Sequence, residues 1–173
     1  MMRCVVTLLA VVFLLAPAFC QSVTPAASTS SQPILKLGGA VPTPLSLTQE
    51  EWARLPRATA SMVVKENGPL QKFEGVLLST LLEGAGVPKG AKLHGKFLLM
   101  YVTARATDGY RALFSISELD AETGSTTGVL VADTVDGKPL DAHNGPLRLI
   151  IPSDKRPERS VCMLDSITVS ALE

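Results

Sequence analysis

The stretch YVTARATDGYRALFSISEL, which runs from Tyr101 to Leu119, contains two apolar, strand-like runs separated by a short polar break. The break is Asp108-Gly109, and this dipeptide is typical of the turn of a β-hairpin because Asp and Gly tolerate the positive φ angles that the turn needs. We therefore predict two antiparallel strands here. Arg105 and Tyr110 flank the turn, so it is also a candidate rim of a binding site.

Similar signals predict short strands on both sides of this hairpin. Asn67-Gly68 separates two apolar runs in the same way, and Asp136-Gly137 follows a run of small and β-branched residues. Near the C-terminus, the apolar residues of 161–169 alternate with polar ones, which is typical of a half-buried strand and places Cys162 on the opposite face. The predicted strands, with hairpins counted whole, lie in residues 34–41, 57–78, 96–117, 128–140, 145–152 and 160–172.

Helical signals are few and short. Thr48 and Glu51, three residues apart, form a capping-box pattern, and Pro56 ends the helix that follows. Leucines at helical spacing predict a second helix in residues 77–87, and residues 115–122 predict a single helical turn. Many strands with a few short helices indicate a mixed α+β domain. The chain of 173 residues suits one such domain.

The first twenty residues have the pattern of a secretory signal peptide. Arg3 precedes an apolar run that ends at Leu15, and small residues follow before Cys20. The run is shorter than the roughly 20 apolar residues of a transmembrane helix, although an uncleaved anchor and a lipidated Cys20 are alternatives. We expect residues 1–20 to be removed, residues 21–33 to form a flexible linker rich in Ser, Thr, Ala and Pro, and the domain to follow.

The composition argues against several function classes. The formal net charge is zero and only 5% of the residues are aromatic, so the chain lacks the basic footprint of a nucleic-acid-binding protein. His94 and His143 are far apart and form no metal-binding pattern, and we expect both on surface loops. The sequence contains no GxSxG elbow, no Walker A motif and no GxGxxG motif.

Two polar clusters remain as candidate binding residues. The first is the hairpin turn with Arg105, Asp108 and Tyr110, and the second is Arg148 with the sequence SDKRPERS at residues 153–160. Cations that lie close together bind phosphate or carboxylate, and guanidinium groups bind these anions in a bidentate way. A solvated loop between two strands is the alternative interpretation. The charged members of this loop are Asp154, Lys155, Arg156, Glu158 and Arg159.

Five segments follow one another in a recognisable order. They are LKLGGAV with PLSLTQEEWARLP, then FEGVLLSTLLEGAGV, ATDGYRALFSISEL, GVLVADTVDGKPL, and NGPLRLIIPSDKRPERSVCMLDSITV. Together they resemble the oxidoreductase molybdopterin-binding domain superfamily, which has the sulfite-oxidase-like fold, and in particular its small exported bacterial members. The resemblance covers residues 34–172. It implies a molybdopterin-binding-like domain and a bacterial protein that is periplasmic or secreted.

The resemblance also implies where a metal ligand belongs. Larger members of the family hold molybdenum on a pterin dithiolene, and a cysteine thiolate from the segment before the second helix is a protein ligand. The corresponding stretch here, ATASMVVKENGPLQKFEG at residues 58–75, contains no cysteine, and Val64, Lys65 and Glu66 lie in that neighbourhood. These residues do not replace a soft thiolate ligand. Cys162 is the only thiol after signal cleavage, and we expect it to be packed rather than bound to a metal.

The resemblance places the DGY turn and the segment after PLR beside the family's cofactor. We therefore expect a pterin-type cofactor or a small anionic ligand to be bound by Asp108, Tyr110, Arg148, Lys155 and Arg159. Redox catalysis by the chain itself is not expected, because no molybdenum ligand is identified. A periplasmic molybdenum-dependent oxidoreductase acting on an oxyanion or sulfoxide, and a non-catalytic protein interaction module, are the alternatives. No nucleic acid and, after signal cleavage, no membrane is expected as a partner, and the sequence names no redox partner.

Overall fold

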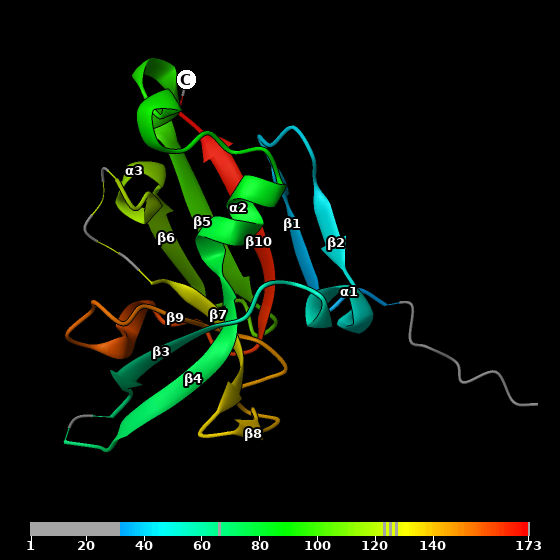
Figure 1. Ribbon diagram of the computed structural model, residues 1–173, viewed down its shortest axis with the longest axis vertical. Coiled ribbons are helices and arrows are strands. Elements are labelled where there is room, and N and C mark those ends of the chain that lie inside the picture. The colour runs from blue at the N-terminus through cyan, green and yellow to red at the C-terminus, as the bar shows by residue number, and fades with distance from the viewer. Residues whose placement is uncertain (1–31, 66, 123, 125, 127, 173) are drawn as a thin grey trace, which may run out of the picture.

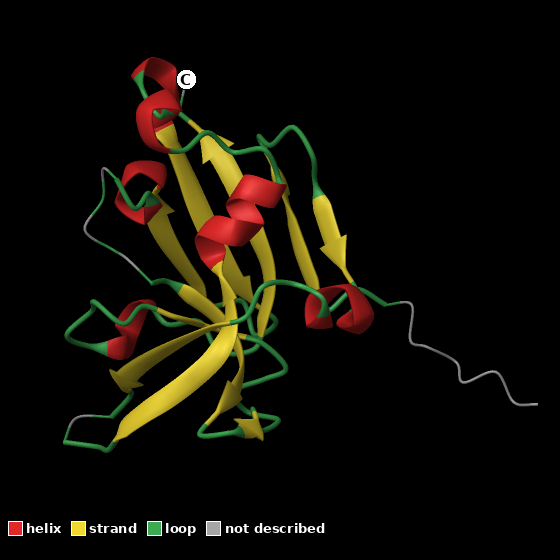
Figure 2. Ribbon diagram, viewed as in Figure 1, coloured by secondary structure: helices red, strands yellow, loops and turns green. Residues whose placement is uncertain are grey.

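The residues that the computed structural model describes (32–65, 67–122, 124, 126 and 128–172) form two sheets that share no strand. The predicted signal peptide and most of the predicted linker lie outside these residues. None of the helices in the described part has the length and hydropathy of a bilayer-spanning segment. The mixed α+β prediction is confirmed, since short strands dominate and the helices are few (Figures 1 and 2).

The first sheet has five strands, and they are antiparallel except for one parallel pair between β1 and β10. This pair places the first and last strands of the domain side by side, and because both run in the same direction, the start of β1 and the end of β10 lie at opposite ends of the sheet (Figure 1). In spatial order the strands are β2 (Leu45–Leu47), β1 (Leu35–Gly39), β10 (Leu164–Ala171), β5 (Met100–Ala106) and β6 (Arg111–Ser115).

The second sheet is built around β7, which pairs with three strands. The β3–β4 hairpin supplies one side, and β8 and β9 pair with different parts of β7 on the other side. The hairpins predicted at Asn67-Gly68, Asp108-Gly109 and Asp136-Gly137 are confirmed. The strands are β3 (Ala58–Val63), β4 (Leu70–Leu77), β7 (Leu130–Val135), β8 (Lys138–Pro139) and β9 (Arg148–Ile150).

Short helices connect the strands. The predicted capping box is confirmed, because the Glu51 amide donates to Thr48 Oγ1 at 3.3 Å while the Thr48 amide donates to Glu51 Oε2 at 2.9 Å. The helices are α1 (Gln49–Ala53), α2 (Leu78–Gly84) and α3 (Ile116–Leu119), with 3₁₀ turns η1 (Gly90–Lys92), η2 (Gly95–Leu99) and η3 (Pro157–Arg159).

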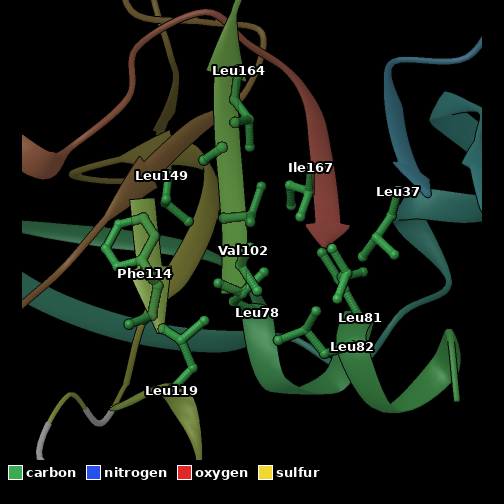
Figure 3. Packing of buried hydrophobic residues seen from close by; sticks show 14 of the residues in the cluster. Leu37, Leu78, Leu81, Leu82, Val102, Phe114, Leu119, Leu149, Leu164 and Ile167 are labelled. Atoms are coloured by element: carbon green, nitrogen blue, oxygen red, sulfur yellow. The ribbon is translucent and has the colours of Figure 1, made fainter. Parts of the chain in front are cut away.

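The main core lies between the first sheet and α2. The inner side chains of the sheet, such as Val102 and Ile167, point toward Leu78 and Leu81 of the helix (Figure 3). All four are almost completely buried. A smaller cluster of buried apolar side chains around Phe73 lies on the second sheet. Burial of these apolar surfaces is the main stabilising term in a domain without a disulfide.

Two predicted strands begin later than expected. Residues 96–99 form the 3₁₀ turn η2, and β5 starts only at Met100. The run from Phe97 to Met100 is uniformly apolar, so it lacks the alternation of polar and apolar residues that would distinguish a strand from a helical turn. At the C-terminus, Met163 has a φ of 48° and β10 starts at Leu164, so the predicted continuous alternation through residues 161–169 is wrong. Cys162 therefore precedes the strand, and it is half-buried.

A cationic hollow beside the charged loop

The charged loop, residues 153–160 between β9 and β10, is held in place by Arg159. The Arg159 guanidinium donates to both carboxylate oxygens of Asp154, from Nε at 2.9 Å and from Nη2 at 2.6 Å. Its Nη1 donates to Glu118 Oε1 at 2.9 Å, and the group lies 5.0 Å from the centre of the Phe114 ring. The hydrogen bond with Asp154 raises the pKa of Arg159. Arg159 is thus an internal anchor that joins the loop to α3 and β6.

The hairpin turn at Asp108-Gly109 is a second support for the charged loop. Asp108 Oδ1 accepts a hydrogen bond from the Tyr110 amide at 2.8 Å, which fixes the turn. The Tyr110 hydroxyl donates to the backbone carbonyl of Glu158. In Figure 1 the orange loop accordingly lies beside β6 on one side and β3 on the other. The DGY turn therefore contacts the charged loop through Tyr110 and does more than close a hairpin.

A hollow of about 320 Å³ lies between the charged loop and the end of β3. Three cations line it, and they are Lys65, Lys155 and Arg156. The one acidic lining residue is Glu158, which lies 3.9 Å from Arg156. Because the two side chains of that pair are 79% and 65% exposed, their interaction is weak and leaves the guanidinium available to a ligand. Val63 and Pro157 complete the lining, which has a net charge of two positive units.

Arg148 lies elsewhere. On β9, its Nη1 donates to Asn144 Oδ1 at 3.0 Å, and its guanidinium lies 5.8 Å from the centre of the Phe73 ring. Its Nε atom is buried and has no hydrogen-bond partner among the described residues. Cys162 Sγ donates to the same Asn144 oxygen at 3.4 Å. The Arg148 side chain therefore belongs to a polar cluster of its own and does not line the hollow.

The five predicted site residues thus separate into four groups. Lys155 lines the hollow, whereas Tyr110 and Arg159 hold the loop that carries it. Asp108 fixes the turn before Tyr110, and Arg148 lies in the neighbouring cluster. Their direct contact with a ligand stays a prediction.

Sequence reasoning did not select Lys65 and Arg156 as site residues. Arg156 belongs to the charged sequence SDKRPERS, but its neighbours gave no reason to prefer it over Arg159. Lys65 is distant in sequence, and only the path of β3 brings it to the loop. The signal that could have found Lys65 is its place in the segment where the resemblance puts a metal ligand.

The donor atoms of the hollow suit an anion and do not suit a thiolate-bound metal. The segment from Ala58 to Gly75 contains no cysteine and no histidine. Within the described residues, no group of three or more His, Cys, Asp or Glu side chains is placed to hold a metal ion. Ammonium and guanidinium groups bind phosphate and carboxylate oxygens by charge-assisted hydrogen bonds.

A further polar cluster joins α1, the start of β3 and β7. The Asp133 carboxylate accepts hydrogen bonds from Arg57 at 2.7 and 2.6 Å and from Trp52 Nε1 at 2.6 Å. Burial acts to raise the pKa of Asp133, but hydrogen bonds from Arg57, Thr134 and Trp52 outweigh it and lower the pKa below its ordinary value. Because these donors all bind Asp133, we interpret the cluster as structural. It links α1 and the residue before β3 to the strand β7.

Comparisons with known proteins identify relatives of the fold. The sequence model of the family described as "Oxidoreductase molybdopterin binding domain" matches residues 23–173. No curated protein matches the chain. Solved structures that match include the sulfane dehydrogenase SoxCD from Paracoccus pantotrophus, with 22% identity and a TM-score of 0.60. The match covers 83% of this chain and 39% of that chain, so this protein spans well under half of that relative's length, and the likeness shows the fold alone.

Proposed function

The chain belongs to the oxidoreductase molybdopterin-binding domain family, as the resemblance predicted, and from that premise we propose that it is an exported domain that binds a phosphate-bearing, pterin-type ligand in the cationic hollow. The observation that carries the proposal is the convergence of Lys65, Lys155 and Arg156 on one hollow from two distant segments. Like charges repel, and three cations that share one weakly paired carboxylate, Glu158, are stabilised by a bound anion.

The support around the hollow fits a preorganised binding loop. Arg159 uses Nε, Nη1 and Nη2 to hold Asp154 and Glu118, and Tyr110 holds the carbonyl of Glu158. The loop is therefore fixed before a ligand arrives, which reduces the entropy cost of binding. The size of the hollow, about 320 Å³, is at the lower end of the range for small-ligand sites, so it suits a phosphate group and part of a ring.

The residues present do not fit a molybdenum centre with a cysteine ligand. Lys65 lies in the segment where the family resemblance puts that cysteine, the segment contains no cysteine, and a protonated lysine does not ligate a metal. Cys162 donates its thiol hydrogen to Asn144, which lies outside the lining of the hollow. We therefore propose ligand binding without molybdenum redox catalysis by this chain, and we derive no reaction step.

Binding of inorganic phosphate and of a stable pterin phosphate tests the proposal. Both are titrated by calorimetry into the chain and into the variant Lys65→Ala/Lys155→Ala/Arg156→Ala. The matched control is Lys36→Ala/Arg54→Ala/Lys138→Ala, which removes three exposed cations elsewhere. We expect the hollow variant to lose at least about tenfold in affinity for the pterin phosphate, and the control to lose little. Equal losses in both variants would show that only net charge matters and would remove the hollow from the site.

Metal analysis separates this function from the redox alternative. The protein is purified from a host that makes molybdopterin, and molybdenum is measured against protein. We expect pterin without stoichiometric molybdenum. Stoichiometric molybdenum would overturn the proposal in favour of an oxidoreductase, and failure to bind either probe would favour a protein interaction module.

A further inference from the structure

An apolar tip forms one end of the long axis of the molecule. It consists of η1, η2 and the end of β10, residues 90–99 and 171–172, which meet where the Leu172 amide donates to the Leu99 carbonyl at 3.1 Å. Figure 1 shows these turns at the top beside the letter C, beyond the other elements. Three leucines at the tip are open to solvent, with Leu98 at 48%, Leu99 at 50% and Leu172 at 62% exposure. Exposed leucines gathered at one protruding end indicate a contact surface.

Two lysines of the 3₁₀ turns precede Leu98 and Leu99 along the chain. Lys92 and Lys96 have no carboxylate within 4.0 Å in the part of the chain that the structure describes. The Lys96 ammonium lies 5.7 Å from the centre of the Phe97 ring, so its stem covers the aromatic side chain while its charge stays in water. Lys89 is paired with Glu83 at 2.6 Å and is neutralised. The carboxylates of Asp120 and Glu122 lie at Gly90, where the tip joins the body of the domain, so the positive charges that accompany the exposed leucines are those of Lys92 and Lys96.

We propose that this tip docks on the surface of a lipid bilayer that contains anionic headgroups, with Leu98, Leu99 and Leu172 in the interfacial region and Lys92 and Lys96 against the headgroups. Membrane-surface segments combine exposed leucine or aromatic side chains with lysines in this way. A protein partner fits less well, because protein interfaces are depleted in lysine and their hot spots in leucine. A tip that protrudes also suits insertion into a soft surface better than docking on a rigid one.

This inference departs from the sequence-based expectation that no membrane is contacted after signal cleavage. That expectation considered only the apolar N-terminal run, and residues 96–104 were predicted separately as a strand. The 3₁₀ turn η2 exposes Leu98 and Leu99 instead. The inference uses none of the residues of the cationic hollow, so either proposal can fail without the other.

A tryptophan placed in the tip gives a local readout. The sequence contains one tryptophan, Trp52, which is buried, so Leu98→Trp adds a single exposed reporter. The full chain with this substitution is mixed with vesicles of phosphatidylcholine, alone or with about one third phosphatidylglycerol. The matched control is Leu113→Trp, since Leu113 is exposed on β6, away from the tip. The apolar N-terminal run is present in both, so any contribution from it is the same.

We expect the emission of the Leu98→Trp variant to shift to the blue and to be quenched by brominated lipid only with anionic vesicles, while the emission of the Leu113→Trp variant stays unchanged. Adding Lys92→Gln/Lys96→Gln to the tip variant should raise the lipid concentration needed by about fivefold or more, and about 0.5 M salt should do the same. Thermal unfolding of each variant checks that the fold is intact. The proposal would be overturned by unchanged emission of the tip variant or by an equal shift in the control variant. It would also be overturned by a shift that depends on protein concentration in the absence of lipid, because that would show self-association.

Discussion

Arg105 and Arg111 lie directly opposite each other on β5 and β6, so two guanidinium groups share the exposed face of one hairpin. Neither has a carboxylate within 4.0 Å among the described residues. Like charges at directly opposite positions destabilise a sheet. The hairpin that the sequence signals most clearly therefore contains a local electrostatic conflict.

Reversing one charge of this pair should stabilise the protein. Arg111→Glu places a carboxylate opposite Arg105, and we expect the free energy of unfolding to rise by about 0.5 kcal/mol at low salt. Arg111→Gln removes only the repulsion and should give a smaller gain. Urea unfolding at low and high salt measures both, and the difference should shrink at high salt. A glutamate variant less stable than the glutamine variant would contradict the pairing.

Replacement of Arg159 should affect both stability and ligand binding, whereas replacement of Arg156 should affect ligand binding alone. Arg159→Ala removes three donors from Asp154 and Glu118, so we expect it to lower the free energy of unfolding by about 1–2 kcal/mol, a range that allows for partial exposure. It should also weaken pterin-phosphate binding, because the loop loses its anchor. Arg156→Ala should weaken binding while leaving stability almost unchanged, since its side chain is 79% exposed. Chemical unfolding and calorimetry on both variants check this, and the reverse assignment would be inconsistent with the structure.

Asp133 should make stability depend on pH in the acid range. Its folded-state pKa is lowered, so its contribution is present above the ordinary value of about 3.9 and is lost as pH falls toward the folded-state value. We expect Asp133→Asn to be less stable than the wild-type chain at pH 7, and the gap to close below about pH 4. Asp165→Asn, at an exposed position on β10, is the control. A gap that is constant with pH would show that Asp133 acts by packing alone.

Much of the fold could be predicted because its signals are local. Turn dipeptides such as Asp108-Gly109 and the capping box of Thr48 and Glu51 act within a few residues, and both are found where expected. The start of β5 could not be predicted, because the apolar run before Met100 has no period. The bend at Met163 was missed because no glycine or asparagine marks its positive φ.

The candidate site could be predicted only in part, because it depends on contacts between distant segments. The charge of the loop at 153–160 was visible in the sequence. The sequence does not show that Asp154 is hydrogen-bonded to Arg159, whereas Arg156 stays exposed. The contact between Lys65 and the same hollow follows from the path of the β3–β4 hairpin. The sequence does not distinguish the cations of one loop from each other. The structure distinguishes them because it shows which of them are paired with carboxylates.

Gly75 should be the least replaceable glycine of that hairpin. A Cβ atom at this position would lie 2.0 Å from the Val131 carbonyl oxygen and 2.6 Å from the Ala132 Cα atom, at a register shift between β4 and β7. Both neighbours are backbone atoms of a central strand, so they move only if the sheet moves. We expect Gly75→Ala to lower the free energy of unfolding by about 3 kcal/mol or more.

Gly38→Ala should act in the opposite direction and is the matched control. Gly38 also lies in a strand, its φ is not positive, and a Cβ atom there would meet nothing within 4 Å. Alanine there restricts the unfolded chain without strain, so we expect a gain of about 0.5 kcal/mol. Urea midpoints compare the two variants. Because β4 carries the hairpin that brings Lys65 to the hollow, Gly75→Ala should also weaken pterin-phosphate binding, whereas Gly38→Ala should not; similar effects of the two alanines would show that the close approach of β4 to β7 does not control the site.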